Sequence, residues 1–208
     1  MRYEEAARRL AHLPATLPEP PGELAPHVTA AGRVRLREIP GTRVAAVLVL
    51  VYPGLDGDAF VLLMERPAGD LRHAGEISFP GGAVEEADTS LAAAALREAR
   101  EEVGLDPEQA GVRIVGLLDP VDVRVSGFEL VPVVCLAERR PELTADPREV
   151  ASIVEAPLGA FVAGAAIEIV DEVRAGWRLH YGAYPVAGHR IWGATARVLG
   201  QLGAILAG

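Results

Sequence analysis

Three glutamates near the end of a predicted helix are the residues best suited to chemistry. The stretch 92–103 predicts an α-helix, because it is rich in alanine and its apolar residues recur at helical spacing, and Gly104 marks its end. At about 100° per residue, Glu98, Glu101 and Glu102 lie within one helical turn. We expect them on a face that points away from the apolar stripe. Carboxylate oxygens grouped in this way are the ligands that Mg²⁺ or Mn²⁺ requires.

The same cluster is unfavourable for the helix alone. Glu98 and Glu102 repel each other at i,i+4 by a few tenths of a kcal/mol, and acids in the last turn lie at the negative end of the helix dipole. Arg97 reaches Glu101 at i,i+4 and offsets part of this cost. A bound divalent cation would offset both the repulsion between the carboxylates and the unfavourable helix dipole. For an isolated Glu-x-x-Glu-Glu, however, a solvated charged face is the more common explanation, so the cluster alone does not decide.

The surrounding spacing resembles the Nudix box of the Nudix hydrolases. The resemblance begins at Gly82 and continues through residues 96–105, LREAREEVGL. Asp88 lies six residues after the glycine and Arg97 nine residues after Asp88, and both features resemble the branch of the family that hydrolyses coenzyme A. A second signature of that branch precedes the box, with its leucine–arginine pair one residue nearer to the histidine than usual: Leu62-Leu63, Arg66, Leu71-Arg72 and the segment from His73 to Gly82.

The resemblance implies a role for each residue of the box. Glu98 and Glu102 are implied as metal ligands, with Glu101 sharing the metal cluster and the carbonyl of Gly82 completing the coordination shell. Arg97 is implied to hold the glutamates in place rather than to contact substrate. The expected cofactor is therefore Mg²⁺ or Mn²⁺.

The general base stays open at this stage. In the family it is either a box glutamate, here Glu101, or a glutamate of a later loop, for which Glu149 is the first candidate and Glu155 the second. Glu149 equally fits a negative charge at a helix N-terminus, where the dipole favours it. We expect Asp88 to cap the N-terminus of the helix rather than to act in catalysis.

Three cationic or polar residues of the upstream signature are expected to bind substrate. Arg66, Arg72 and His73 are candidates to contact phosphate groups, because the arginine fork bonds two oxygens at once. Coenzyme A carries a 3′-phosphate besides its diphosphate, which gives additional cationic contacts a purpose. The alternative for each residue is ordinary surface solvation.

The predicted elements indicate one α/β domain. Strands and helices mix without strict alternation, which predicts a mixed sheet covered by helices on both faces, and the resemblance implies the Nudix α/β/α sandwich. We expect residues 1–34 to form a helix and a proline-rich connector packed on the core, and residues 35–208 to form a single Nudix domain. Strands are predicted at 43–52, 60–65, 112–118, 121–125 and 128–137, a late hairpin at 167–173 and 177–184, and helices at 3–12 and from 191 onward.

The composition excludes several kinds of protein. All 20 basic residues among the 208 are arginines, which excludes a Schiff-base lysine and a P-loop. The net charge of −9 argues against a nucleic-acid partner. Residues 44–52 form the longest apolar run, too short to span a membrane, and the charged N-terminus does not resemble a signal peptide, so we expect a cytoplasmic protein. Cys135 is the single cysteine and is expected to be a buried strand thiol.

These observations predict a metal-dependent hydrolase that splits coenzyme A, or its acyl or oxidised forms, into 3′,5′-ADP and a 4′-phosphopantetheine product. One alternative is a Nudix enzyme for another nucleoside diphosphate derivative, such as ADP-ribose or NADH. A second, of another class, is a non-catalytic nucleotide-binding module. A homodimer is also a possible arrangement, since several relatives are dimers.

Overall fold

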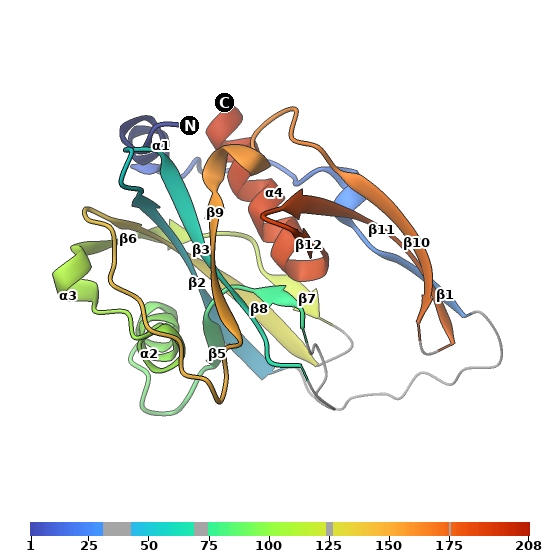
Figure 1. Cartoon of the computed structure of the whole chain (residues 1–208), viewed down its shortest axis with the longest axis horizontal. Coiled ribbons are helices and arrows are strands. Elements are labelled where there is room, and N and C mark those ends of the chain that lie inside the picture. The colour runs from blue at the N-terminus through green and yellow to red at the C-terminus, as the bar shows by residue number, and fades with distance from the viewer. Residues whose placement is uncertain (31–42, 69–74, 124–126, 175) are drawn as a thin grey trace.

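The computed structural model describes residues 1–30, 43–68, 75–123, 127–174 and 176–208. These residues form two sheets with helices packed on them (Figure 1). The predicted substrate residues Arg72 and His73, and the proposed domain boundary at 34/35, lie outside the described residues, so all three stay predictions. Within the described residues, no helix combines the length and the apolarity needed to cross a bilayer.

The main sheet is mixed and is built around two long apolar strands. The central strand β2 (Arg43–Pro53) pairs parallel with β8 (Phe128–Ala137) and antiparallel with β3 (Ala59–Glu65). Both long runs are rich in valine, as expected for strands that are covered on both faces. The remaining strands of this sheet are β4 (Ile77–Ser78), β5 (Gly81–Ala83), β6 (Val112–Leu117), β7 (Val121–Val123) and β9 (Ser152–Pro157).

Alternate residues of β2 point into two separate cores. Ala46, Leu48 and Leu50 face α2 (Leu91–Val103), whereas Val47 and Val49 face the core beneath α1 (Tyr3–Leu10) and α4 (Gly193–Ala207). Figure 1 shows α2 on one side of the sheet and α4 on the other. The short helix α3 (Pro107–Ala110) follows α2. The prediction of an α/β/α sandwich with a mixed sheet is confirmed.

A second, antiparallel sheet stands beside the first. It contains the predicted late hairpin, β10 (Glu168–Arg174) and β11 (Trp177–Val186), together with β1 (His27–Ala30) and β12 (His189–Ile191). Strand β9 ends at Pro157 and leads into a 3₁₀-helix, η2 (Leu158–Phe161). The C-terminal helix begins at Gly193 rather than at 191, because residues 189–191 pair with β11.

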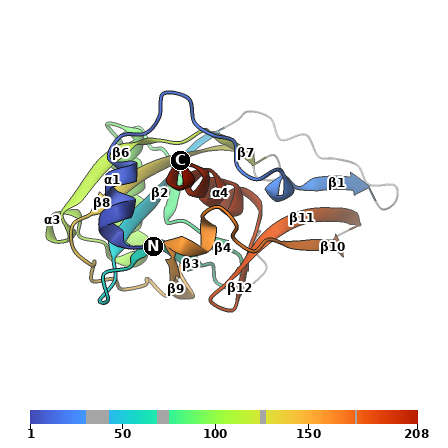
Figure 2. The ribbon, with the colours of Figure 1, turned by 90° about the horizontal axis from the view of Figure 1, so that it is seen from above.

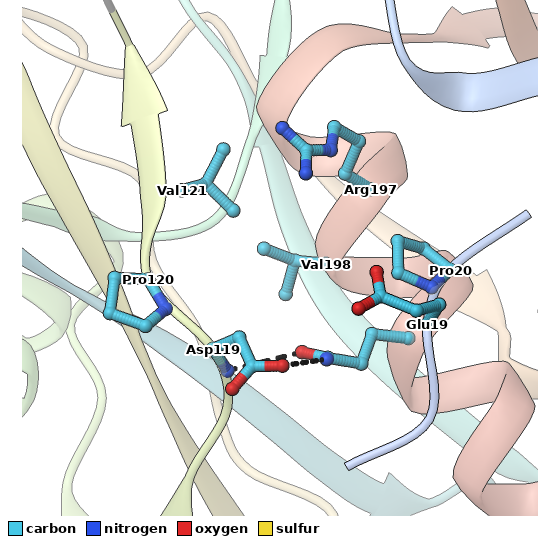
Figure 3. Close-up of a pocket in the computed structure, with 8 residues that line it drawn as sticks. Glu19, Pro20, Asp119, Pro120, Val121, Arg197 and Val198 are labelled. Carbon is cyan, nitrogen blue, oxygen red and sulfur yellow. Dashed lines mark hydrogen bonds between the residues drawn. The ribbon is translucent and has the colours of Figure 1, made fainter. Parts of the chain in front are cut away.

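The N-terminal helix and connector pack against α4. Ala6 and Leu10 of α1 are fully buried, and Figure 2 shows α1 beside α4 with the two chain ends close together. A second 3₁₀-helix, η1 (Gly22–Leu24), interrupts the proline-rich connector. The buried amide of Gln201 on α4 donates to Pro18 O at 3.1 Å and to Asp119 Oδ2 at 2.6 Å. Figure 3 shows the small pocket beside these bonds, which lies on the α4 side of the sheet, opposite α2.

Candidate active site

The short strand β5 brings its main chain unusually close to β2. Gly81 has φ +151°, a conformation that other residues rarely adopt, and a Cβ added to it would lie 2.6 Å from Val47 Cα. Gly82 pairs with Ala46 in the same ladder. Gly81 thus permits the close approach to β2, and Gly82 leaves space on the other side, where Glu98 of α2 lies.

Glu102 is the most buried of the three glutamates. Its residue is 4% exposed, and its Oε2 accepts a hydrogen bond of 2.8 Å from the Gly81 amide. The expectation that all three glutamates point away from the apolar face is wrong for Glu102. Glu102 follows Ala95 and Ala99 at i+7 and i+3, so it continues the stripe that these buried alanines begin.

Burial governs the protonation of Glu102. Removal from water raises the pKa of its carboxyl from 4.5 to about 7, and the charges of Glu98 and Glu149 act in the same direction. The Gly81 amide and the positive charge of Arg66 oppose the rise in this pKa. One hydrogen bond and one nearby cation therefore compensate only part of the cost of burying this charge.

Glu98 lies directly over Gly82. A Cβ added to Gly82 would meet the Glu98 carboxyl carbon at 2.6 Å, so the side chain occupies the space that the glycine leaves. Burial raises the pKa of Glu98, as do the charges of Glu101 and Glu149, whereas Arg97 lowers it. Glu101, in contrast, has a 58% exposed side chain and contacts Arg97 at 3.4 Å.

Arg97 connects the helix to the loop that precedes it. Its Nε and Nη2 bond the two oxygens of Asp88 at 3.1 and 3.0 Å, Nη2 also donates to Ala83 O at 3.2 Å, and Nη1 donates to Glu98 at 2.9 Å. All parts of its fork are thus engaged within the protein. These bonds fix the side chain of Glu98, which supports a positioning role for Arg97.

The predicted capping role of Asp88 is wrong. Ser90 is the N-cap of α2, and its hydroxyl accepts from the Ala93 amide at 3.1 Å. An N-cap residue must lie immediately before the first helical residue to reach the free amides of the first turn. Asp88 lies three residues before Leu91, the first residue of α2, and is too far away. Its carboxylate instead accepts from Arg97 and from the Glu85 amide at 2.8 Å, and the Arg97 bond is the main reason that its pKa is lowered.

Glu149 belongs to a separate loop that contacts the end of α2. Its negative charge contributes to the raised pKa of both Glu98 and Glu102. The loop reaches the end of α2 through a hydrogen bond of 2.8 Å from the Asp146 amide to Glu102 O. Among the described residues, no hydrogen bond or ion pair engages the carboxylate of Glu149. The sequence placed Glu149 near a helix start, but no helix follows, because β9 begins at Ser152.

The second loop candidate, Glu155, belongs to another cluster. It accepts a hydrogen bond of 2.8 Å from the Tyr52 hydroxyl and forms an ion pair with Arg140. Tyr52 lies six residues along β2 from Ala46, the partner of Gly82, which separates the two positions by about 20 Å. The suggestion that Glu155 is the general base is therefore not supported by its place in the fold.

Arg66 directly follows β3, close enough to the buried Glu102 for its charge to act on that carboxyl. Its amide donates to Glu76 O at 3.0 Å, and its charge lowers the pKa of Glu102. In the part of the chain that the structure describes, its guanidinium makes no hydrogen bond or ion pair. Arg66 is therefore available to an anion.

The donors fit a hard divalent cation that keeps part of its water shell. As they stand, no three His, Cys, Asp or Glu side chains within the described residues converge closely enough to surround an ion. Magnesium, however, is commonly held by one or two carboxylates together with water and substrate phosphates. Glu98 and Glu102 supply such carboxylates, and the charge of Glu149 acts on both.

Two contributors to this arrangement were not identified from the sequence. The Gly81 amide holds Glu102, and Asp146 ties the Glu149 loop to α2. Both contacts join segments that lie far apart in the chain, so spacing along the sequence does not reveal them. The Asp146-Pro147 pair was a turn signal that could have drawn attention to this loop.

Comparison with known proteins agrees with this geometry. Residues 42–166 match the model of the NUDIX domain. An uncharacterised Nudix hydrolase, NudL, from Citrobacter koseri is 41% identical over 169 residues, which cover 77% of this chain and 81% of the relative. The corresponding protein of Cronobacter sakazakii is 40% identical over 172 residues, with coverages of 77% and 81%. A MutT/nudix family protein of Enterococcus faecalis matches the fold with a TM-score of 0.51 at 16% identity, over 82% of this chain and 64% of that one.

Proposed function

The chain belongs to the Nudix hydrolase family, and we propose that its substrate is coenzyme A or a derivative, cleaved at the diphosphate bond. Enzymes of this family generally use a divalent metal ion, typically Mg²⁺ or Mn²⁺. The products would be 3′,5′-ADP and 4′-phosphopantetheine or its acyl form. One observation carries the proposal of catalysis: Glu98 lies over Gly82 beside the buried Glu102, whose carboxyl bonds the Gly81 amide and has like charges near it.

The cation would be held by Glu98 and Glu102, with Glu101 at the exposed rim and the Gly82 carbonyl nearby. When bound, such an ion neutralises phosphate oxygens and lowers the pKa of a water molecule. The protein's own contribution is to hold these carboxylates in place before substrate arrives. The Gly81 amide fixes Glu102, and Arg97 fixes Glu98.

Glu149 is the proposed general base. A base must have a carboxylate that is free to accept a proton from the attacking water, within reach of the reacting phosphorus. Glu149 meets the first condition among the described residues, and its charge acts on both Glu98 and Glu102. Glu101 is the alternative, but its ion pair with Arg97 occupies it in part.

The choice of coenzyme A depends on the cationic residues around the substrate. The charge of Arg66 acts on Glu102, its guanidinium has no bonding partner among the described residues, and Arg72 and His73 follow it in the chain. A second phosphate at the 3′ position would give these groups a partner that ADP-ribose or NADH does not offer. The spacing of Asp88 and Arg97 resembles the same branch and supports the same substrate.

Product analysis tests the proposal. The pure protein is incubated with Mg²⁺ or Mn²⁺ and with coenzyme A, dephospho-coenzyme A or ADP-ribose. We expect release of 3′,5′-ADP from coenzyme A, with dephospho-coenzyme A a clearly poorer substrate because it lacks the 3′-phosphate. Cleavage of ADP-ribose alone would refute the substrate, and cleavage of none would support a non-catalytic nucleotide-binding module.

A further inference from the structure

The loop that carries Glu149 is organised by one aspartate. Asp146 Oδ1 accepts from the Arg148 amide at 2.9 Å, and Asp146 O accepts from the amides of Glu149 and Val150 at 3.1 and 2.8 Å. An aspartate that accepts from the amide two residues later forms an Asx turn, which substitutes side-chain bonding for regular structure. The backbone of Glu149 is therefore fixed by bonds to Asp146.

The turn is attached at both ends to elements of the candidate site. At one end, the Asp146 amide donates to Glu102 O at 2.8 Å. At the other end, the Ala151 amide donates to Glu65 O at 2.9 Å, and Val150 is buried in the core beneath α2. Glu102 is itself a proposed metal ligand, and Glu65 is the residue immediately before Arg66, a proposed substrate contact. The turn thus has a fixed position relative to both of these groups.

Asp146 also forms an ion pair with Arg148, the cation that is nearest to Glu149 along the chain. Arg148 bonds the Asp146 carboxylate through Nε at 3.0 Å and through Nη2 at 2.6 Å. The guanidinium of Arg148 is therefore bonded to Asp146 through two nitrogens. The carboxylate of Glu149 has no bonding partner among the described residues.

We propose that Asp146 is a positioning residue, which presents the Glu149 carboxylate to Glu98 and Glu102 and keeps Arg148 away from it. This inference rests on the proposed function of Glu149 in the hydrolase. It assigns Asp146 no contact with the substrate. Its effect on catalysis passes entirely through Glu149.

A double-mutant cycle tests this coupling. The variants are Asp146→Ala, Glu149→Gln and the two combined, assayed for kcat and KM with whichever diphosphate substrate the wild type cleaves. We expect Asp146→Ala to lower kcat by about tenfold or more with little change in KM, because small displacements of a catalytic group are costly. The double variant should be no slower than Glu149→Gln alone.

Two further variants separate positioning from general loss of structure. Asp146→Asn keeps an acceptor for the Arg148 amide and should retain kcat within about threefold of the wild type. Asp106→Ala is the control, because Asp106, like Asp146, accepts from the amide two residues later. It bonds the amides of Glu108 and Gln109 at 3.0 Å at the start of α3. This control should leave kcat unchanged. Additive losses in the double variant, or an equal loss in Asp106→Ala, would overturn the inference.

A titration with Mn²⁺ provides a readout that does not need activity. Asp146→Ala and Glu149→Gln should weaken Mn²⁺ binding to the same extent, and the double variant should bind no more weakly than either. If the wild type cleaves none of the substrates, the proposed function fails, and this titration alone decides about Asp146. Any other pattern of Mn²⁺ affinities then refutes the positioning role.

Discussion

Two carboxylate clusters lie on the α2 side of the main sheet and differ in how completely their charges are compensated. Near the far end of β2, Glu155 has a hydroxyl donor in Tyr52 and an ion pair with Arg140. Over the double glycine, Glu102 has one amide donor and like charges beside it. A carboxylate that only stabilises a fold is expected to have partners for its charge. The cluster that contains the poorly compensated Glu102 is therefore the one that we assign to chemistry.

The largest difference between the clusters should appear in activity. Glu102→Gln removes the charge of a buried proposed metal ligand while keeping the shape of the side chain, and we expect kcat to fall by at least about 100-fold, more than is typical of groups outside the coordination shell. Glu155→Gln is the matched control and should leave kcat unchanged. Steady-state assays with Mg²⁺ measure both. Equal activity of Glu102→Gln and the wild type would remove the argument for the metal site.

The second difference concerns pH and stability without metal. Because burial raises the pKa of Glu102 from 4.5 to about 7, the folded protein binds more protons than the unfolded chain in this range. Its stability should therefore fall as pH rises from about 4.5 to about 7, by at most about 3 kcal/mol. Urea unfolding in a chelator at pH 5 and pH 8 measures the change. Glu102→Gln should show a smaller change, and an identical change in both proteins would contradict the assignment.

The third difference concerns the cluster around Glu155, which should affect stability but not activity. Glu155→Ala leaves the buried Tyr52 hydroxyl without its acceptor, so we expect the free energy of unfolding to fall by about 1–3 kcal/mol. The activity of the folded protein should stay at the wild-type level. Thermal or urea unfolding, together with an assay below the transition, tests both parts. A loss of kcat in folded Glu155→Ala would show that the two clusters are not independent.

The smallest expected effect concerns Asp88, which holds Arg97 and, through it, Glu98. Asp88→Asn removes the charge that Arg97 bonds through both Nε and Nη2 and should lower kcat by about tenfold, the lower range for groups that orient metal ligands. Mn²⁺ binding should weaken in parallel. Ser90→Ala is a useful comparison, because it removes the true N-cap at a cost of about 1 kcal/mol in stability and should spare kcat. The reverse pattern would return Asp88 to a capping role.

Much of the fold followed from local pattern. The continuous valine-rich runs predicted β2 and β8, and Gly104 adopts the left-handed conformation expected at a helix end. The buried thiol of Cys135 is confirmed as well. The start of the C-terminal helix was predicted wrongly because pairing between distant segments decides it. Residues 189–191 form a strand because β11 lies beside them, which no local signal reveals.

The sequence by itself determined which residues are available for chemistry: the glutamates of α2, the double glycine before them, and the arginine between. Their types and spacing are local properties of the chain. Tertiary structure alone decided that Glu102 is buried, that the loop of Glu149 bonds the end of α2 and that Glu155 pairs with Tyr52 instead. These outcomes depend on how β5, α2 and the 146–150 turn meet across the sheet. Desolvation and long-range charge arise only when segments far apart in the chain are packed together.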